Sequence, residues 1–346
     1  MKDAKLAVSD LTFFKRFKPM YDFTILVLSG AYSSSVALTL DILSAAASMA
    51  ARVGAASPRW RVYAADTRIG LSHGLSIETK TLPKTARADG STWVVPGLGL
   101  ENPSTLGNRL TQADAQRAIQ ALRSQARSGG TVAASCSSVF LLQAADLLAG
   151  KKVTTSWWLG PALQRLESRC QVDADRMVIT DGNIVTAGAA LAQTDLMLHL
   201  LRSQFGTALA DGVARVLLID GRQAQAPFIV PTLLASGNEL IAKLTARIEA
   251  ALPNLPSVAE LAAEFCVSER TLARHVQAAT GRSTLTLVQS IRLGKARMLL
   301  ETSRLTVDQV AERVGYGDAT ALRRLMRKVV GATPRQFRPS ALAQSG

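Results

Sequence analysis

The chain has 346 residues, too many for one ordinary domain, and hydrophobic residues make up 48% of it against 19% charged residues. This composition excludes a disordered protein, because it supplies ample apolar surface for a core. The 40 Lys and Arg outnumber the 26 Asp and Glu and give a formal net charge of +14. Such a surplus favours a polyanionic partner, either nucleic acid or a membrane surface.

Cysteine spacing and targeting signals further limit the class of protein that we expect. The three cysteines, Cys136, Cys170 and Cys266, show no C-x-x-C spacing, so we expect no disulfide framework and no metal site. Residues 1–19 form a basic extension without the apolar stretch of a signal peptide, and no run approaches 18 apolar residues. We therefore expect a cytoplasmic protein that neither spans nor binds a membrane.

Residues 20–225 alternate short β-rich runs with helical stretches, which is typical of an α/β domain with a parallel sheet. The Asp181-Gly182 pair predicts a tight hairpin between two of the strands. The fold class we predict is a flavodoxin-like sandwich of helices around a parallel sheet. The predicted strands are 21–28, 59–65, 91–95, 131–134, 177–180 and 183–186, and the predicted helices are 34–52, 111–127, 137–148 and 189–203.

The strand pattern ends at residues 226–237, which carry two prolines and a glycine and are predicted to be a linker. Residues 238–338 contain only short helices broken by prolines and glycines, and 339–346 form a tail. From 237 to the end there are 16 Lys and Arg against 9 Asp and Glu, about twice the positive charge density of the preceding part. The sequence thus predicts an all-α, basic second domain.

The second domain contains a predicted helix-turn-helix unit. Ser257 with Glu260 forms a capping box for a first short helix, and Ser268 caps a second helix after a tight turn. In this second helix Leu272 and Val276 would face the core, so the outward side chains are Arg270, Thr271 and Arg274. An all-α bundle with a solvated basic face would explain this unit alone equally well.

The same arrangement of two capped helices joined by a tight turn occurs a second time, which favours DNA binding over a bundle with a solvated basic face. Thr306 opens another capped short helix, Gly315-Tyr316-Gly317 forms its turn, and Asp318 caps the next helix. Leu322 and Met326 face inward there, and the outward residues are Thr320, Arg323, Arg324, Arg327 and Lys328. A long helix at about 285–300 joins the two units.

These motifs resemble the tandem helix-turn-helix domain of AraC/XylS-type transcriptional regulators. The similar residues are Ser268, Arg270, Thr271, Leu272, Arg274, Gly281, Arg292, Leu293, Ala296, Leu299, Leu300, Val310, Ala311, Val314, Gly315, Tyr316, Gly331, Thr333, Pro334, Phe337 and Arg338. Val276 and Met326 stand where the family usually has Phe. The resemblance implies two recognition helices that enter successive major-groove segments on one face of double-stranded DNA. We expect the eight outward residues named above to bind the DNA, with Arg327 and Lys328 at phosphates, and RNA polymerase to be a further partner.

The first domain contains a candidate nucleophile elbow. Residues 131–134 are a strand, a helix follows from Ser137, and Cys136 lies at the sharp turn, where backbone N–H groups favour an anion. A nucleophilic thiol needs a base within reach and an acid that orients the base. A lone cysteine is otherwise a small buried apolar residue.

The surrounding segments, 134–142, 149–155 and 184–188, resemble the ThiJ/PfpI-like (class I glutamine-amidotransferase-like) fold, which occurs at the N-terminus of many AraC-type regulators. Catalytic members carry an acidic residue and a histidine where this chain has Ser35 and Ser156. The three histidines lie elsewhere: His73 in a loop, His199 in an apolar helix, and His275 in the second domain. The resemblance therefore implies that 20–225 is a sensing domain without catalysis.

The residues around the elbow suit a small polar ligand instead. The candidate ligand-binding residues are Cys136, Ser137, Ser156, Trp157, Ser35 and Asp41. Helix N-termini suit carboxylates, an indole face suits a quaternary amine, and Asp41 suits an amine. This set predicts an effector of amino acid, amine or betaine type.

We predict a sequence-specific transcriptional regulator that senses a small molecule, needs no cofactor or metal, is not an enzyme, and forms a homodimer. The alternative is a glutamine-amidotransferase-like Cys hydrolase or lyase fused to a DNA-binding module. The substitutions at Ser35 and Ser156 argue against this alternative.

Overall fold

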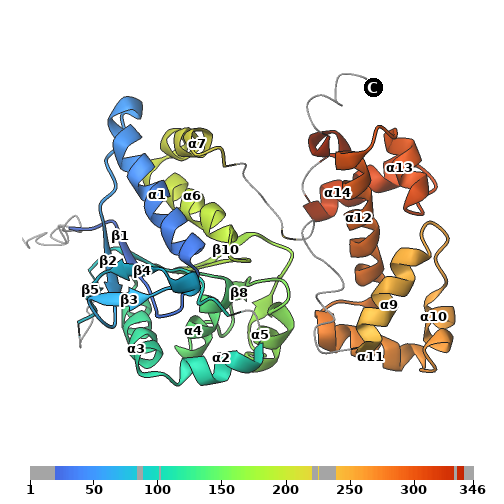
Figure 1. Ribbon diagram of the computed structural model, residues 1–346, viewed down its shortest axis with the longest axis horizontal. Helices are drawn as coiled ribbons and strands as arrows, with labels where there is room; N and C mark the ends of the chain where they lie inside the picture. Colours follow the sequence, from blue (N-terminus) through green and yellow to red (C-terminus); the bar gives the residue numbers. More distant parts are fainter. Residues whose placement is uncertain are drawn as a thin grey trace, which may run out of the picture.

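The computed structural model describes residues 20–83, 89–100, 103–219, 225, 239–330 and 333–338. The predicted N-terminal extension, the linker 226–237 and the tail 339–346 lie outside these residues. Figure 1 shows an α/β part and a helical part joined by the chain between α7 and α9.

A seven-stranded sheet with the order β10-β11-β7-β6-β1-β2-β5 forms the centre of the first domain. All its neighbouring strands run parallel except β10 and β11, which pair antiparallel across Asp181-Gly182 as predicted. The strands are β1 Phe23–Leu26, β2 Trp60–Ala64, β5 Lys80–Thr81, β6 Thr92–Val95, β7 Val132–Ser135, β10 Val178–Asp181 and β11 Ile184–Ala187. The strands β1, β6 and β7 are buried along their whole length, because helices cover both faces of a parallel sheet. The predicted α/β sandwich is confirmed.

Two helical layers enclose this sheet (Figure 1). One layer consists of α1 Ser33–Met49, α6 Ala192–Phe205 and α7 Thr207–Val216. The other consists of α2 Pro103–Leu110, α3 Ala113–Arg127, α4 Val139–Ala144 and α5 Gly160–Leu166. Two small two-stranded sheets complete the domain: β3 Arg68–Gly70 with β4 Ser76–Glu78, and β8 Lys152–Val153 with β9 Gln171–Val172.

Among the described residues, Ser33–Val53 is a helical segment long and apolar enough to cross a membrane. In the structure its apolar residues Val36, Ile42 and Leu43 are buried against the sheet layer and the helices α6 and α7. This helix is therefore accounted for as a core element of the α/β domain.

The second domain is all-α, as predicted. Its helices are α9 Glu239–Ala250, α10 Val258–Glu264, α11 Glu269–Thr280, α12 Thr284–Thr302, α13 Val307–Arg313 and α14 Ala319–Val330. The predicted capping box at Ser257 forms, and the predicted cap at Thr306 is also a capping box. Ser257 Oγ accepts from the Glu260 N–H, and Thr306 Oγ1 accepts from the Gln309 N–H, each at 3.2 Å. The pairs α10–α11 and α13–α14 are the two helix-turn-helix units, and α12 connects them.

The turns of the two units place different residues in the same left-handed conformation. Cys266 has φ +54° between α10 and α11, and Gly315 has φ +84° between α13 and α14. A Cβ added to Gly315 would lie 2.5 Å from the Pro253 carbonyl oxygen, which is a fixed backbone atom. Glycine is required at 315, whereas 266 tolerates a side chain at the cost of backbone strain.

We expect Cys266→Gly to stabilise the protein by about 0.5–1 kcal/mol. Residue 266 keeps its left-handed conformation in this variant, but removal of the Cβ relieves a steric strain of about 1–2 kcal/mol. This gain exceeds the cost of the extra conformational entropy of glycine in the unfolded chain, about 0.4–1 kcal/mol. Gly315→Ala should instead cost about 2–3 kcal/mol. Urea unfolding of the three proteins measures both changes, and shifts of the same sign would contradict this account of the turns.

The two domains touch at the C-terminal end of α11. Arg165 of α5 donates to the Ala278 carbonyl at 2.9 Å, and Arg282 forms an ion pair with Asp175. Trp157 of the α/β domain is 5% exposed and packs into the apolar cluster of α9, α10, α11 and α12. Its ring meets Trp158 edge to face, with 5.1 Å between the centroids. The tryptophan pair is thus a hydrophobic contact between the domains.

Candidate DNA interface and sensing site

The two candidate recognition helices each have a buried and an exposed side. On α11, Leu272 and Val276 are fully buried, whereas Arg270 and Arg274 are exposed and Thr271 is half-buried. On α14, Leu322 and Met326 are fully buried, and the exposed side chains are Thr320, Arg323, Arg324, Arg327 and Lys328. All eight predicted DNA-binding residues are therefore accessible to a partner at least in part.

The N-termini of these helices are fixed by their caps. The Ser268 hydroxyl accepts from the Thr271 N–H at 3.2 Å, and an Asp318 carboxylate oxygen accepts from the Ala321 N–H at 2.8 Å. Because a capped first turn holds its backbone in place, the following side chains project in defined directions. A rigid helix with outward arginines is the device that reads base edges in a major groove.

Cys136 forms the predicted elbow at the end of β7. It has φ +55°, and its N–H donates to the Gly188 carbonyl at 2.7 Å. The Ser156 hydroxyl donates to the Cys136 sulfur at 3.0 Å, and the Thr155 hydroxyl donates to the Cys136 carbonyl at 2.7 Å. The thiol therefore accepts a hydrogen bond from a hydroxyl group at the position where the resemblance assigns a histidine.

The three histidines have other surroundings. His73 is exposed in a turn, and His275 lies on α11. His199 is hydrogen-bonded to the Thr180 hydroxyl at 2.9 Å, and burial lowers its pKa. At the position assigned to the acidic residue, the Ser35 hydroxyl donates to the Ala190 carbonyl at 3.0 Å. A serine hydroxyl that donates its hydrogen bond to another group does not act as a general base near neutral pH.

The structure brings together four of the six candidate ligand-binding residues. Cys136, Ser137, Ser156 and Ser35 are all fully buried, and both Cys136 and Ser35 bond to the loop 188–190. Asp41 lies on the exposed side of α1, about 9 Å further along the helix than Ser35. Trp157 packs toward the C-terminal domain, as described above.

Other residues line the elbow that the sequence did not single out for ligand binding. A Cβ added to Gly97 would lie 3.1 Å from the Cys136 Cβ and 3.2 Å from the Tyr32 ring. Gln193 accepts from the Ser135 hydroxyl at 2.6 Å and donates to the Thr39 hydroxyl at 2.8 Å. The glycine turn at 96–99 was a detectable signal for this close approach, whereas nothing in the local sequence marks Gln193.

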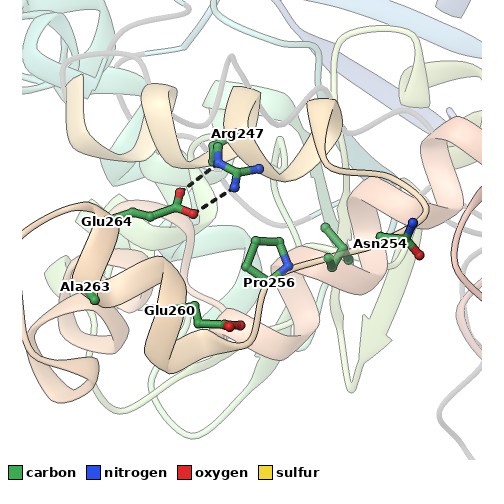
Figure 2. A pocket seen from close by; sticks show the side chains of 7 residues that line it. Arg247, Asn254, Pro256, Glu260, Ala263 and Glu264 are labelled. Carbon is green, nitrogen blue, oxygen red and sulfur yellow. Dashed lines mark hydrogen bonds and ion pairs between the residues drawn. The ribbon is translucent and has the colours of Figure 1, made fainter.

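A hollow of about 700 Å³ opens on the second domain between α9 and α10, and Figure 2 shows it. Arg247 and Glu264 cross it as a two-pronged ion pair, with N–O distances of 2.7 and 2.8 Å. Leu255 and Pro256 form its apolar wall. Because the charges of Arg247 and Glu264 already neutralise each other in this ion pair, we assign the hollow no binding role.

Two family models match the chain. The DJ-1/PfpI family model matches residues 24–203, and a helix-turn-helix domain model matches residues 261–340. The first covers just over half of the chain, and both coincide with the two domains of the structure.

Two transcriptional regulators are similar to this chain over most of its length, and one crystal structure is similar over just over half of it. The HTH-type transcriptional regulator GbdR of Pseudomonas aeruginosa (strain UCBPP-PA14) is 26% identical over 81% of this chain and 74% of its own. The HTH-type transcriptional regulator GlxA of Rhizobium meliloti (strain 1021) is 27% identical over 78% of this chain and 81% of its own. A crystal structure of an AraC family transcriptional regulator from Pseudomonas putida, 20% identical, covers 57% of this chain and 99% of its own with a TM-score of 0.49.

Proposed function

Because this chain belongs to the DJ-1/PfpI family and carries the helix-turn-helix domain of AraC-type transcriptional regulators, we propose that it is a one-component regulator whose α/β domain senses a small metabolite without catalysis. The observation that carries the proposal is the pair of equivalent, capped helix-turn-helix units. Each presents exposed arginines on its second helix. The effector we propose is of amino acid, amine or betaine type.

Selection from a randomised duplex library tests the DNA-binding half of this proposal. We expect one enriched site with two subsites about 10 base pairs apart, because two recognition helices on one face reach successive major-groove segments. A variant with both Arg274→Ala and Arg323→Ala should lose the enrichment. Weak and uniform binding to every sequence would contradict the proposal and would indicate a DNA-coating protein.

The hydrogen bonds around the elbow argue against catalysis. The Ser156 hydroxyl donates to the Cys136 sulfur, and Ser35 donates to a backbone carbonyl, so these two positions supply neither a base nor an orienting carboxylate. The left-handed φ of Cys136 is nonetheless the geometry of a nucleophile elbow, and it supports the alternative of a Cys hydrolase or lyase.

We expect the full chain to hydrolyse glutamine and to convert methylglyoxal no faster than its Cys136→Ala variant. Turnover requires a thiolate generated by a base, and the positions assigned to the base and the acid hold hydroxyl groups. Steady-state assays of both proteins at matched concentration measure the difference. A rate at least ten times that of Cys136→Ala would establish the enzyme and overturn the sensing role.

We also propose that the regulator acts as a homodimer in the cytoplasm and contacts RNA polymerase at its promoters. A dimer would present four helix-turn-helix units to a repeated site, which multiplies the contacts with DNA. Sedimentation equilibrium of the full chain tests the dimer. A monomer at micromolar concentration would contradict it and would leave the DNA-binding proposal intact.

A further inference from the structure

The side chain of Gln225 is buried in the α/β domain next to the Cys136 elbow. Gln225 is 2% exposed, and its own N–H donates to the Asp175 carbonyl at 2.7 Å. Its amide oxygen accepts from the Ala189 N–H at 3.0 Å. A residue at the very end of the predicted sensing domain therefore reaches back into that domain.

The amide nitrogen of Gln225 is surrounded by more acceptors than it can use. Four oxygen atoms lie 2.9–3.2 Å from it: Thr154 Oγ1 and the carbonyl oxygens of Thr155, Ala174 and Arg176. A carboxamide nitrogen carries two hydrogens. The Thr154 hydroxyl can supply its own hydrogen to the Arg176 carbonyl at 3.0 Å, which leaves its oxygen as an acceptor. We call this group of oxygens, with the Ala189 N–H, the amide cradle.

Gly188 makes room for the amide. A Cβ added to Gly188 would lie 2.2 Å from the amide carbon of Gln225, 2.4 Å from its oxygen and 2.5 Å from its nitrogen. The cradle therefore exists only because residue 188 has no side chain. Gly188 also accepts the N–H of Cys136, so the cradle shares a wall with the elbow.

The cradle is also connected to the DNA-binding domain. Two of its acceptors, the carbonyls of Ala174 and Arg176, flank Asp175, whose carboxylate pairs with Arg282 of the C-terminal domain. A third acceptor belongs to Thr155, two residues before Trp157 in the domain contact. A change of occupant in the cradle would therefore act on both segments that hold the second domain.

We propose that the amide cradle is the recognition site for a primary amine, amidine or primary amide group of the effector, and that Gln225 is its internal occupant. This inference rests on the proposed sensing function. Four clustered acceptors suit a nitrogen with two or three N–H groups and repel a carboxylate. An effector that supplies such a group replaces the Gln225 amide in the cradle.

Chemical rescue of an emptied cradle tests the proposal. In the full-length Gln225→Ala variant, acetamide and methylammonium chloride should raise the melting temperature saturably by about 2–4 °C, since ligand binding to the folded state stabilises by mass action. Sodium acetate at the same concentration should give no saturable rise. The wild-type protein should respond less than half as strongly, because Gln225 already fills the site.

A matched variant decides whether the rescue occurs in the cradle. In the Gln225→Ala, Gly188→Ala double variant, the new Cβ occupies the position of the amide, and the rescue should disappear. Equal rescue in the single and double variants, or no rescue in the single variant, would overturn the proposal.

If Gln225→Ala does not fold, the isosteric Gln225→Glu variant provides the test. It places a carboxylate against four acceptor oxygens, so its melting temperature at pH 8 should fall at least 5 °C below that of the wild type. An unchanged melting temperature would overturn the proposal. DNA binding by the wild type is measured separately. The proposal of a DNA-binding regulator and the proposal of a recognition site in the cradle can therefore be contradicted independently.

Discussion

Replacing Arg274 with alanine is expected to relax base preference at one or two positions of the target site and to leave the preference elsewhere unchanged. Arg274 is exposed on α11, one turn after Arg270, and Ala273 between them leaves room for close approach to DNA. An arginine that bonds to both O6 and N7 of guanine contributes about 1–3 kcal/mol of discrimination. Binding of the variant to a randomised-site library measures the effect.

Lys328→Ala is the matched control for this prediction. Lys328 is exposed in the last turn of α14, where a phosphate contact is expected and a base contact is not. Its loss should weaken binding to all sequences evenly and reduce the salt slope by about 1. If Arg274→Ala has the same base preferences as the wild type, the prediction that α11 contacts the bases is wrong.

Trp157→Ala is expected to loosen the DNA-binding domain, although Trp157 lies in the α/β domain. The truncation removes a nearly buried indole from the cluster formed by Ile241, Leu244, Leu272 and Val276. Removing a large aromatic side chain from a packed site costs about 3–5 kcal/mol. Hydrogen exchange in α9 and α11 should accelerate accordingly.

Trp93→Ala is the control for this second prediction. Trp93 is 1% exposed on β6 and packs only within the cluster of the α/β sheet and its α2–α5 layer. Its truncation should accelerate exchange in the sheet and leave α9 and α11 unchanged. Equal exchange in α9 and α11 for the wild type and Trp157→Ala would contradict a stabilising contact between the domains.

Elements with a strong local signal are predictable from this sequence. The capping boxes at Ser257 and Thr306, the Asp181-Gly182 hairpin and the buried strand around Val94 all depend on a few neighbouring residues. The side-chain hydrogen bonds of the two capping boxes span three positions, so the local sequence contains the whole interaction. The hairpin and the strand carry their signal locally, although the strand pairs with β1 and β7. Helices α2, α5 and α7 were missed, because α2 and α5 have only eight and seven residues and α7 follows α6 after the single residue Gly206.

The sequence by itself determined the two-domain organisation, the α/β and all-α classes, the outward arginines and the replacement of a base by Ser156. Periodicity and caps are local properties, and the motifs that carry the family resemblance are contiguous. Only the tertiary structure decided that Trp157 packs against the DNA-binding domain and that Asp41 lies on an exposed helix side. It alone brought Gln225 to Gly188, because the six groups that bind the Gln225 amide and backbone come from segments 36 to 71 residues earlier in the chain. Contacts at such separation depend on how strands are ordered in the sheet, and no local pattern encodes that order.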